Sequence, residues 1–257
     1  MKLFLASAFL LGTATLAYAQ QTAKPEDTEV YEPVPKVVTA SPNLAPPPSD
    51  ALVLFDGKDL SQWVTTEDRN APAKWKVAGG IFTVDKTTGN IETKKDFINY
   101  QLHLEWRIPA NISGTGQARG NSGLFLASLG KGDLGYELQI VDSYNNKTYV
   151  NGMAGSIYKQ RVPLANPARK PGEWQSYDVI WMAPTFKADG SVQTPARVTV
   201  FFNGVLVQNN VELAGPTRYI GPASYEGQKA GPAPIKLQAH GDKSEPDSFR
   251  NIWVREL

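Results

Sequence analysis

NYQLHLEWRI (residues 99–108), GNSGLFLAS (120–128) and GYELQIVD (135–142) are the three stretches that decide the fold. In the first, the apolar residues from Tyr100 to Ile108 occupy every second position. Strict alternation of apolar and polar residues is the period of a β-strand with one buried face. The third stretch alternates in the same way. The two runs therefore predict strands with a core behind them and a polar face in front.

The polar positions of these strands carry groups that can bind or react. His103, Glu105 and Arg107 follow one another on one face of the first strand, and Glu137 and Gln139 share a face of the third. Side chains at alternate positions of a strand point to the same side of its sheet. If both strands belong to one sheet, we expect Glu105, Arg107 and Glu137 on its concave polar face, where a polar ligand would bind.

Most of the remaining chain repeats the strand pattern. ARVTVFF and VLVQ flank Asn203-Gly204, which is a strong signal for a hairpin with a type I′ turn. Residues 143–174 are rich in glycine, proline and asparagine and predict loops over one end of the sheet. No window has sustained helical periodicity. About ten to twelve strands predict an all-β chain folded as a β-sandwich or jelly roll.

Three regions follow one another along the chain. Residues 1–19 have a positive start at Lys2, a short apolar run and a small-x-small cleavage site, which are the features of a secretory signal peptide. Residues 20–50 are rich in proline and poor in large apolar residues, and predict a disordered linker. Residues 51–257 have the length of one β-sandwich domain. We therefore expect a periplasmic or secreted bacterial protein with no integral membrane segment once the signal is removed.

Composition excludes several classes of site and partner. The chain has no cysteine, so it has no disulfides, no lipid-modified cysteine and no thiolate metal ligands. Its formal net charge is +1 and its basic residues form no block. Nothing in this pattern favours binding to nucleic acid or to an anionic membrane surface.

The only two histidines, His103 and His240, both lie on predicted strands. His240 ends the run IKLQAH, shares a face with Lys236 and Gln238, and precedes Gly241, where a backbone can approach a ligand closely. Neutral imidazole is well matched to proton transfer near pH 7, so His240 is the first candidate for a general base. The alternative for both histidines is a hydrogen-bonded structural role.

The candidate catalytic carboxylates are Glu105 and Glu137, with Asp142 close to the latter. A retaining glycosidase needs two carboxylates on one face. Here Gln139, which cannot ionise, occupies the matching position, and Asp142 has the opposite parity to Glu137. An ordinary two-carboxylate glycosidase is therefore disfavoured. A structural alternative is that Glu137 pairs with Arg107 or Arg250 across the sheet.

Several polar or aromatic side chains are candidates for binding a polar ligand such as a sugar. Asn121 and Ser122 lie in GNSG, which could equally be a plain turn before a strand. Trp174 follows a loop and is available for stacking, whereas most other tryptophans are in phase with the buried positions of their strands. The full set of candidate binding residues is Arg107, Asn121, Ser122, Gln139, Trp174, Gln238 and Arg250.

In combination and in order, a set of motifs resembles the family called the 3-keto-disaccharide hydrolase domain, formerly a domain of unknown function. The motifs span nearly all of residues 51–257 and read LFDGKDLSQW, EWRI, GNSGLFL, YELQIVD, GSIY, GEWQSYDV, FFNG, LQAHGD and FRNIWVREL. The resemblance implies a concanavalin- or laminin-G-like jelly-roll sandwich, export, and action on oxidised glycosides. One departure is DKSEPDS (242–248), which intervenes between the LQ-x-HG segment and FRNI and is expected to reshape the site near His240.

The activity implied by this resemblance fits the residues better than ordinary hydrolysis does. A ketone at C3 of a sugar acidifies the proton on C2. A base can remove that proton, the group on C1 then leaves, and water adds back. This route needs one base and an electrophile for the enolate oxygen. His240 with a nearby glutamate and arginine would suffice, and a divalent cation held by oxygen ligands and histidine could also be the electrophile.

Two alternatives from other classes remain open on the sequence. The domain could be a non-catalytic carbohydrate-binding module, because the same sandwich serves both roles. It could also be a conventional glycoside hydrolase.

Overall fold

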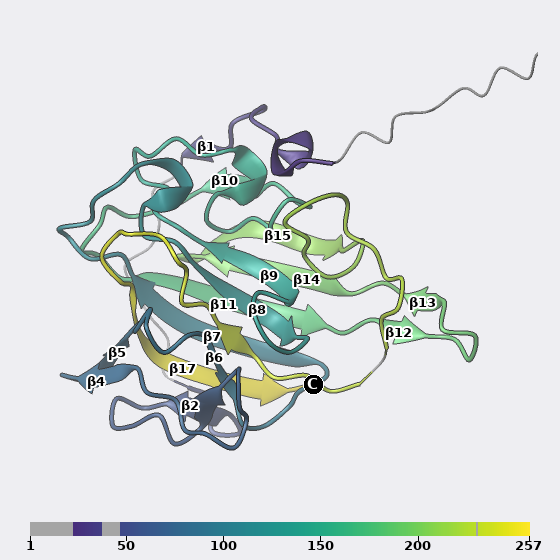
Figure 1. The fold of residues 1–257 in the computed structure, drawn as a ribbon, viewed down its shortest axis with the longest axis horizontal. Helices are drawn as coiled ribbons and strands as arrows, with labels where there is room; N and C mark the ends of the chain where they lie inside the picture. The colour runs from purple at the N-terminus through teal and green to yellow at the C-terminus, as the bar shows by residue number, and fades with distance from the viewer. Residues whose placement is uncertain (1–22, 38–46, 230) are drawn as a thin grey trace, which may run out of the picture.

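Two β-sheets lie face to face in the computed structural model, which describes residues 23–37, 47–229 and 231–257 (Figure 1). The larger is an eight-stranded sheet with the order β15-β14-β11-β7-β17-β5-β4, and β2 also pairs with β17. The smaller is a five-stranded sheet with the order β3-β6-β16-β8-β9. The expected all-β sandwich is therefore confirmed.

The strands of the larger sheet are β2 (Leu52–Phe55), β4 (Lys76–Ala78), β5 (Ile81–Thr83), β7 (Tyr100–Arg107), β11 (Gln175–Met182), β14 (Arg197–Phe202), β15 (Val205–Glu212) and β17 (Ser248–Glu256). Those of the smaller sheet are β3 (Trp63–Thr65), β6 (Ile91–Thr93), β8 (Ser122–Ser128), β9 (Gly135–Ile140) and β16 (Lys236–Leu237). Two short pairs complete the strands, β1 (Lys36–Val37) with β10 (Ala165–Asn166) and β12 (Thr185–Phe186) with β13 (Val192–Thr194). The short 3-10 helices are η1 (Pro25–Thr28), η2 (Gly116–Ala118) and η3 (Val150–Gly152).

The core between the two sheets is formed by the apolar positions that the alternation predicts. Tyr100 and Trp106 of β7 are fully buried there, together with Leu138 of β9. Two phenol groups cross from the larger sheet to the smaller one. The hydroxyl of Tyr100 donates to the Leu126 carbonyl at 2.6 Å, and that of Tyr177 donates to the Gln139 carbonyl at 2.7 Å. These bonds satisfy buried polar groups and fix the relative position of the two sheets.

The expectation that Glu105, Arg107 and Glu137 share one sheet face is wrong. Strand β7 belongs to the eight-stranded sheet and β9 to the five-stranded sheet, on the other side of the core. The strand parity holds, because each strand turns its apolar row inwards. The polar rows consequently face outwards in opposite directions. Alternation fixes the side of a strand that is buried, but not the sheet to which that strand belongs.

The hairpin between β14 and β15 has the predicted turn. Asn203 and Gly204 have φ angles of 51° and 78°, and positive φ at both central positions is the requirement of a type I′ turn. The Asn203 side chain also accepts a hydrogen bond from the Ser176 amide at 2.8 Å, which attaches the turn to β11.

Part of the expected linker lies against the domain. Strand β1 pairs in parallel with β10, and the Val150 amide donates to the Val30 carbonyl at 2.6 Å. The prediction of a disordered tether is therefore wrong for residues 23–37, called here the N-terminal arm. Composition missed it because the arm is held largely by hydrogen bonds of its backbone to the backbone and to polar side chains of the domain, which need few apolar residues in the arm. The expected signal peptide (1–19) and residues 38–46 lie outside the described residues.

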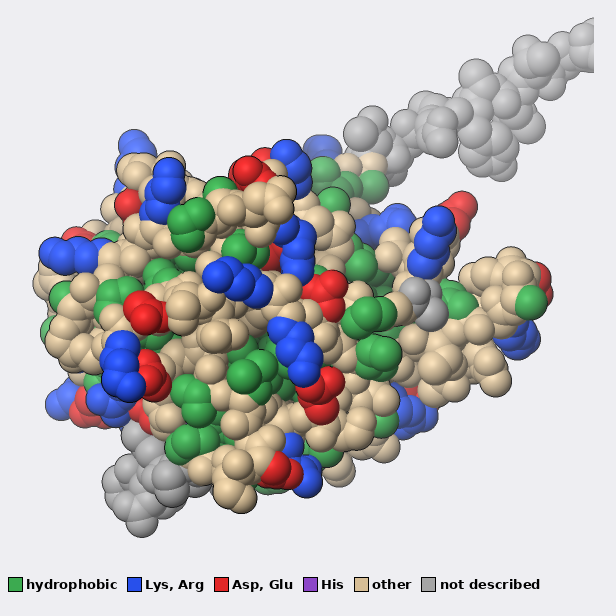
Figure 2. Space-filling model, turned by 90° about the horizontal axis from the view of Figure 1, so that it is seen from below, with side chains coloured by type: hydrophobic (Ala, Val, Ile, Leu, Met, Phe, Trp, Pro, Cys, Tyr) green, Lys and Arg blue, Asp and Glu red, His purple; other side chains and the backbone are tan. Residues whose placement is uncertain are grey.

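The described surface offers no continuous basic area on the face shown in Figure 2, where basic and acidic side chains are interspersed. This distribution agrees with the formal net charge of +1. Within the described ranges, no helix is long and apolar enough to cross a membrane.

Candidate functional site

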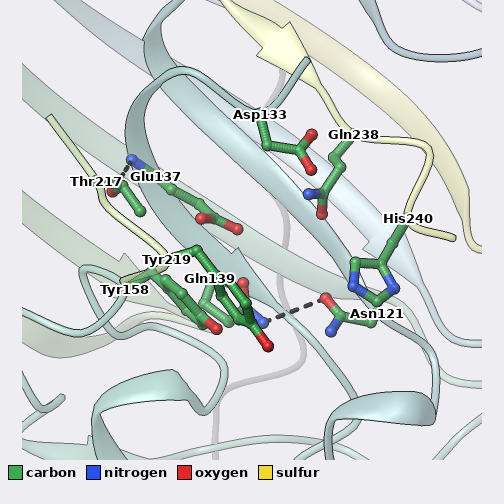
Figure 3. Close-up of a pocket in the computed structure, with 9 residues that line it drawn as sticks. All are labelled: Asn121, Asp133, Glu137, Gln139, Tyr158, Thr217, Tyr219, Gln238 and His240. Atoms are coloured by element: carbon green, nitrogen blue, oxygen red, sulfur yellow. Dashed lines mark hydrogen bonds between the residues drawn. The ribbon is translucent and has the colours of Figure 1, made fainter. Parts of the chain in front are cut away.

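A polar pocket lies on the outer face of the five-stranded sheet, where the polar positions of neighbouring strands meet. Gly123 of β8 pairs with Gln139 of β9, and the Gln238 amide donates to the Gly123 carbonyl at 3.0 Å. These contacts place Glu137, Gln139 and Gln238 around one hollow of about 120 Å³ (Figure 3). Its lining residues are Asn121, Asp133, Glu137, Gln139, Tyr158, Thr217, Tyr219, Gln238 and His240.

Gly123 forms the floor of the pocket because it has no side chain. A Cβ atom at this position would lie 2.7 Å from Glu137 Oε1 and 3.3 Å from Gln238 Oε1. Both distances are shorter than ordinary van der Waals contacts. The last glycine of the GNSG motif therefore allows the Glu137 carboxyl group to lie across the strand, which gives this motif a role beyond that of a turn.

Glu137 is a buried carboxyl group in an acidic environment. Its side chain is almost inaccessible, and its carboxyl oxygens have no hydrogen-bond partner among the described residues. Burial raises the pKa of Glu137 to about 8, the negative charge of Asp133 acts in the same direction, and Lys236 opposes it. At pH 7 the group is therefore mostly a neutral acid, which can donate a hydrogen bond to a ligand oxygen.

Gln139 and Gln238 add two acceptors without partners. Both side chains are buried, and the Oε1 atom of each has no hydrogen-bond partner in the described structure. The Gln139 amide nitrogen is occupied, because it donates to Gln117 Oε1 at 3.1 Å and to Asn121 Oδ1 at 3.2 Å. A buried acceptor left without a donor costs roughly 1–3 kcal/mol. Ligand hydroxyl groups would supply the missing donors.

His240 lies at the edge of the pocket with one nitrogen fixed by the chain. Its Nδ1 atom is 2.8 Å from Asp242 Oδ2, and the ring is half-buried. The Asp242 amide nitrogen also lies 3.2 Å from Nδ1, but the shorter contact with the charged carboxylate favours a proton on Nδ1, so that Nε2 is left as the basic nitrogen. Burial acts to raise the pKa of Asp242, but hydrogen bonds from Ser244, His240 and Lys86 outweigh it and lower that pKa. Asp242 is therefore a carboxylate that orients His240.

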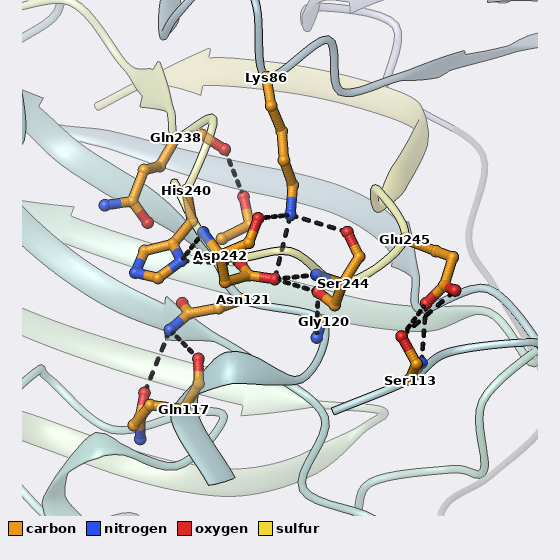
Figure 4. Close-up of polar contacts among 11 residues, drawn as sticks. Lys86, Ser113, Gln117, Gly120, Asn121, Gln238, His240, Asp242, Ser244 and Glu245 are labelled. Carbon is orange, nitrogen blue, oxygen red and sulfur yellow. Dashed lines mark hydrogen bonds and ion pairs between the residues drawn. The ribbon is translucent and has the colours of Figure 1, made fainter. Parts of the chain in front are cut away.

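The inserted segment DKSEPDS supplies Asp242 and is itself held in place (Figure 4). The Lys86 ammonium donates to Asp242 Oδ1 at 3.1 Å and to the carbonyls of Asp242 and Ser244, each at 3.0 Å. The Ser244 hydroxyl binds the Asp242 carboxylate and accepts a hydrogen bond from the Gly120 amide at 3.0 Å. The insertion thus forms the support of His240, at the position where the sequence predicted a reshaped edge.

Asp133 reaches the pocket on a short loop after β8. Lys236 holds this loop through three hydrogen bonds from its ammonium to the carbonyls of Gly130, Gly132 and Leu134, at 2.7, 2.8 and 2.9 Å. Burial lowers the pKa of Lys236 to about 8, while neighbouring carboxylates oppose the shift, so it remains an ammonium at pH 7. All three of its donors are used by the loop.

Asn90 connects this loop to the segment after β16 that carries His240. Its Nδ2 atom donates to Asp133 Oδ1 at 3.0 Å, and its Oδ1 atom accepts from the Ala239 amide at 2.7 Å. One side chain therefore sets the position of residues on both sides of the pocket.

Four predicted site residues lie elsewhere. Glu105, Arg107, Trp174 and Arg250 cluster on the outer face of the eight-stranded sheet, away from the pocket. Arg250 Nε is 2.6 Å from Glu105 Oε2, and the Arg107 and Arg250 guanidinium groups lie 4.6 and 4.1 Å from the centre of the Trp174 ring. The structural alternative, in which Glu137 pairs with Arg107 or Arg250, is therefore wrong, because Glu105 is the carboxylate that pairs with Arg250.

His103 belongs to the same outer cluster. Its Nδ1 atom is 2.7 Å from Asp178 Oδ1. Burial acts to lower the pKa of His103, but hydrogen bonds with Asp178 and Glu105 outweigh it and raise that pKa to about 9. A histidine held as a cation by two carboxylates fits the structural alternative given above. The neighbouring Asn251, at a bulge in β17 with a φ of 45°, donates to Glu105 Oε1 at 2.6 Å.

Of the predicted residues, Asn121, Glu137, Gln139, Gln238 and His240 are brought together in the pocket. Ser122 does not line it: the Ser122 hydroxyl donates to the Gln238 carbonyl at 2.8 Å and so positions that residue. The sequence reasoning missed Asp133, Tyr158, Thr217 and Tyr219, which lie on loops where no periodicity indicates the direction of a side chain. Only the GSIY motif, which contains Tyr158, could have indicated one of them.

The described residues contain no group of three or more histidine, cysteine, aspartate or glutamate side chains arranged to hold a metal ion. The pocket brings together the His240 imidazole and the buried Glu137 carboxyl group.

An all-β sandwich with a hydrogen-bonding pocket on an outer sheet face is an architecture that carbohydrate-binding domains share with proteins of other functions. The chain belongs to the 3-keto-alpha-glucoside-1,2-lyase-like domain family, whose model matches residues 50–255. No curated protein sequence matches the chain.

Solved structures agree with this assignment. A candidate glycosyl hydrolase from Parabacteroides distasonis is 53% identical to this chain, with a TM-score of 0.78 over 90% of this chain and 96% of the other. A second candidate glycosyl hydrolase from the same organism shares the fold at 21% identity and a TM-score of 0.57, over 80% of this chain and 94% of the other. The family and the first relative together support a carbohydrate-active enzyme of the hydrolase or lyase type.

Proposed function

We propose that this protein cleaves 3-keto-glycosides by base-promoted elimination followed by hydration. The observation that carries the proposal is the pairing of two proton-exchanging groups at one pocket. Glu137 is a buried acid with a pKa raised to about 8, and His240 has a carboxylate on Nδ1 that leaves Nε2 as its basic nitrogen. A base and a neutral acid are the two groups that an elimination next to a ketone requires.

His240 is the base in this mechanism. Its Nε2 atom takes the proton from C2 of the 3-keto sugar, and the electron pair of the broken C–H bond moves towards the C3 oxygen as an enolate. The enolate then re-forms the C3 carbonyl, a double bond forms between C1 and C2, and the C1–O bond breaks. The imidazolium returns the proton to the departing oxygen, so the leaving group is released as an alcohol. Addition of water across C1 and C2 gives the free 3-keto sugar.

Glu137 is the hydrogen-bond donor to the C3 oxygen. A carboxylic acid kept neutral by burial stabilises a developing enolate oxygen more than a ketone oxygen, which is the condition for catalysis. Asp133 supports this role because its charge helps to keep the proton on Glu137. The unpaired carbonyl oxygens of Gln139 and Gln238 would accept hydrogen bonds from sugar hydroxyls and orient the ring.

A paired substrate assay tests the reaction. A chromogenic glucoside and its 3-keto derivative are compared, with release expected from the 3-keto form alone. In deuterated water the product should carry deuterium at C2, and a substrate deuterated at C2 should react several-fold more slowly. Binding of both compounds without release from either would instead indicate a carbohydrate-binding module.

One observation favours a second candidate, a conventional glycoside hydrolase. Asp133 and Glu137 are two carboxyl groups at the same pocket, and the charge of Asp133 raises the pKa of Glu137. In such an enzyme Glu137 would be the acid and Asp133 the base or nucleophile. Release from both chromogenic compounds, with no deuterium at C2, would support this candidate against the elimination.

A further inference from the structure

One wall of the pocket is built from two tyrosines, which are connected to the N-terminal arm through other side chains. Tyr158 and Tyr219 line the pocket side by side in Figure 3. The Tyr158 amide donates to the Glu137 carbonyl at 3.1 Å, so this wall is attached directly to the strand that carries the buried acid. Any displacement of Tyr158 would therefore change the surroundings of Glu137.

Lys159, the next residue, fastens these tyrosines. Its ammonium donates to the Tyr219 carbonyl at 2.9 Å and lies 4.7, 5.7 and 5.7 Å from the ring centres of Tyr219, Tyr158 and Tyr149. A cation over an aromatic face is attracted by the ring, by about 0.5–1 kcal/mol at exposed sites and more when partly buried. One side chain thus holds two tyrosines of the β9–β10 connection and one of the β15–β16 connection.

The same ammonium binds the N-terminal arm, because it also donates to the Pro25 carbonyl at 2.7 Å. The backbone of Lys159 is held in an unusual conformation for a residue with a side chain, with a φ of 57°. Its amide donates to the Asn151 carbonyl at 2.7 Å, which supports that conformation. Residues in such conformations cluster at functional sites.

Asn151 binds the arm at a second point. Its Oδ1 atom accepts from the Val30 amide at 3.0 Å and its Nδ2 atom donates to the Thr28 carbonyl at 2.8 Å. Tyr31 of the arm also contacts Tyr149 edge to face, with 6.3 Å between ring centres. The arm, Asn151, Lys159 and the tyrosine wall therefore form one continuous set of contacts that ends at Glu137.

We propose that Lys159 is a positioning residue that locks the tyrosine wall of the pocket to the N-terminal arm, and that the arm is thereby part of the ligand-binding unit. The kinetic part of this inference rests on the proposed function. The tyrosine wall gives a sugar ring an aromatic surface, and Lys159 keeps that surface in place before the ligand arrives. Because coupling between sites is reciprocal, occupation of the pocket stabilises the arm, which itself lines no part of the pocket.

The test compares Lys159→Met with Lys159→Arg in the full chain. Methionine keeps a long side chain without donors or charge, whereas arginine can still donate to both carbonyls and lie over the rings. Lys58→Met is the matched control, because Lys58 is a highly exposed lysine on the loop between β2 and β3, which does not line the pocket. We expect KM for the 3-keto-glucoside to rise about tenfold in Lys159→Met with kcat within about twofold, a pattern that reports lost substrate binding. Lys159→Arg should recover most of the loss.

Amide hydrogen exchange provides a readout that does not depend on turnover. In Lys159→Met without ligand, the amides of Val30 and Tyr158 should both exchange about tenfold faster, because local opening of the arm and of the wall becomes easier. Faster exchange at Val30 with an unchanged rate at Tyr158 would overturn the proposal, since the arm would then not be coupled to the wall. This outcome is distinct from a failure of the proposed function, in which the 3-keto-glucoside is not cleaved by the wild-type protein but both amides still respond.

Discussion

The carboxyl group of Glu137 lies across the backbone of Gly123, so close that a Cβ atom on Gly123 would be 2.7 Å from Glu137 Oε1. A single methyl group would therefore displace the acid or the backbone beneath it. The position of the Glu137 carboxyl group on β9 therefore depends on residue 123 of the neighbouring strand β8 being glycine.

Gly123→Ala is expected to disable the pocket while the protein still folds. Insertion of a methyl group into a close contact costs about 1–3 kcal/mol in stability. Because the acid is pushed out of position, kcat/KM should fall about 100-fold, which is the size of a loss of transition-state positioning. Urea denaturation and kinetics on the 3-keto-glucoside measure the two effects.

Gly241→Ala is the matched stability control, since a Cβ atom there would meet nothing within 4 Å. Full activity in Gly123→Ala would show that Glu137 takes no part in the reaction.

The pH dependence of activity should report the proton on Glu137. Its pKa is raised to about 8 by burial and by Asp133, and the neutral form is the active one. We therefore expect kcat/KM to fall as pH rises through about 8. In Glu137→Gln the amide still donates a hydrogen bond but cannot ionise, so a reduced activity should persist without this alkaline decline. An unchanged decline in the variant would assign it to another group.

The same carboxyl group should make folding stability depend on pH. The folded pKa of about 8 lies above the ordinary value of 4.5, so the neutral form is favoured in the folded state. Its contribution to stability is fully present below about 4.5 and is lost as pH rises through about 8. Chemical denaturation at pH 5 and pH 9 should show a smaller loss of stability with pH in Glu137→Gln than in the wild-type protein. Equal losses in both proteins would contradict the assignment.

His240→Gln should lower kcat/KM on the 3-keto-glucoside by about 10² or more, the usual effect of removing a general base. His103→Gln is the control, because His103 lies on the opposite sheet and contacts Asp178 and Glu105 rather than the pocket. That variant should lose stability but keep the turnover of its folded fraction.

If dialysis against a chelator abolishes wild-type activity, a bound metal ion takes part in the reaction and His240 becomes a candidate ligand.

The sequence predicted which side of each strand is buried, but not the sheet to which the strand belongs. The alternation in residues 99–108 and 135–142 placed Tyr100, Trp106 and Leu138 in the core, as the structure confirms. The same alternation could not show that Glu105 and Glu137 face away from each other. The chain passes from one sheet to the other through the loop after β7. Tertiary packing, rather than the local alternation of apolar and polar residues, decides the path of that loop.

The pocket residues that the sequence predicted and those that it missed differ in the same way. Glu137, Gln139, Gln238 and His240 were found because they lie on strands or at their ends, where parity is informative. Asp133 and Tyr219 come from loops that are held by contacts from distant segments, such as those made by Asn90 and Lys159. Side-chain direction in such loops is set by hydrogen bonds that no short window of sequence contains.

The Tyr177 hydroxyl donates through the core to the Gln139 carbonyl, at the strand that carries the pocket floor. The floor is therefore part of a buried sheet that is bonded through the core to the other sheet, whereas Asp133 and Tyr219 lie on surface loops. The sheet floor would then determine which sugar ring reacts, and the surface loops would determine which leaving groups are accepted. Directed variation of residues 218–220, which leaves Asp133 and Thr217 in place, should alter the range of leaving groups without changing the chemical step.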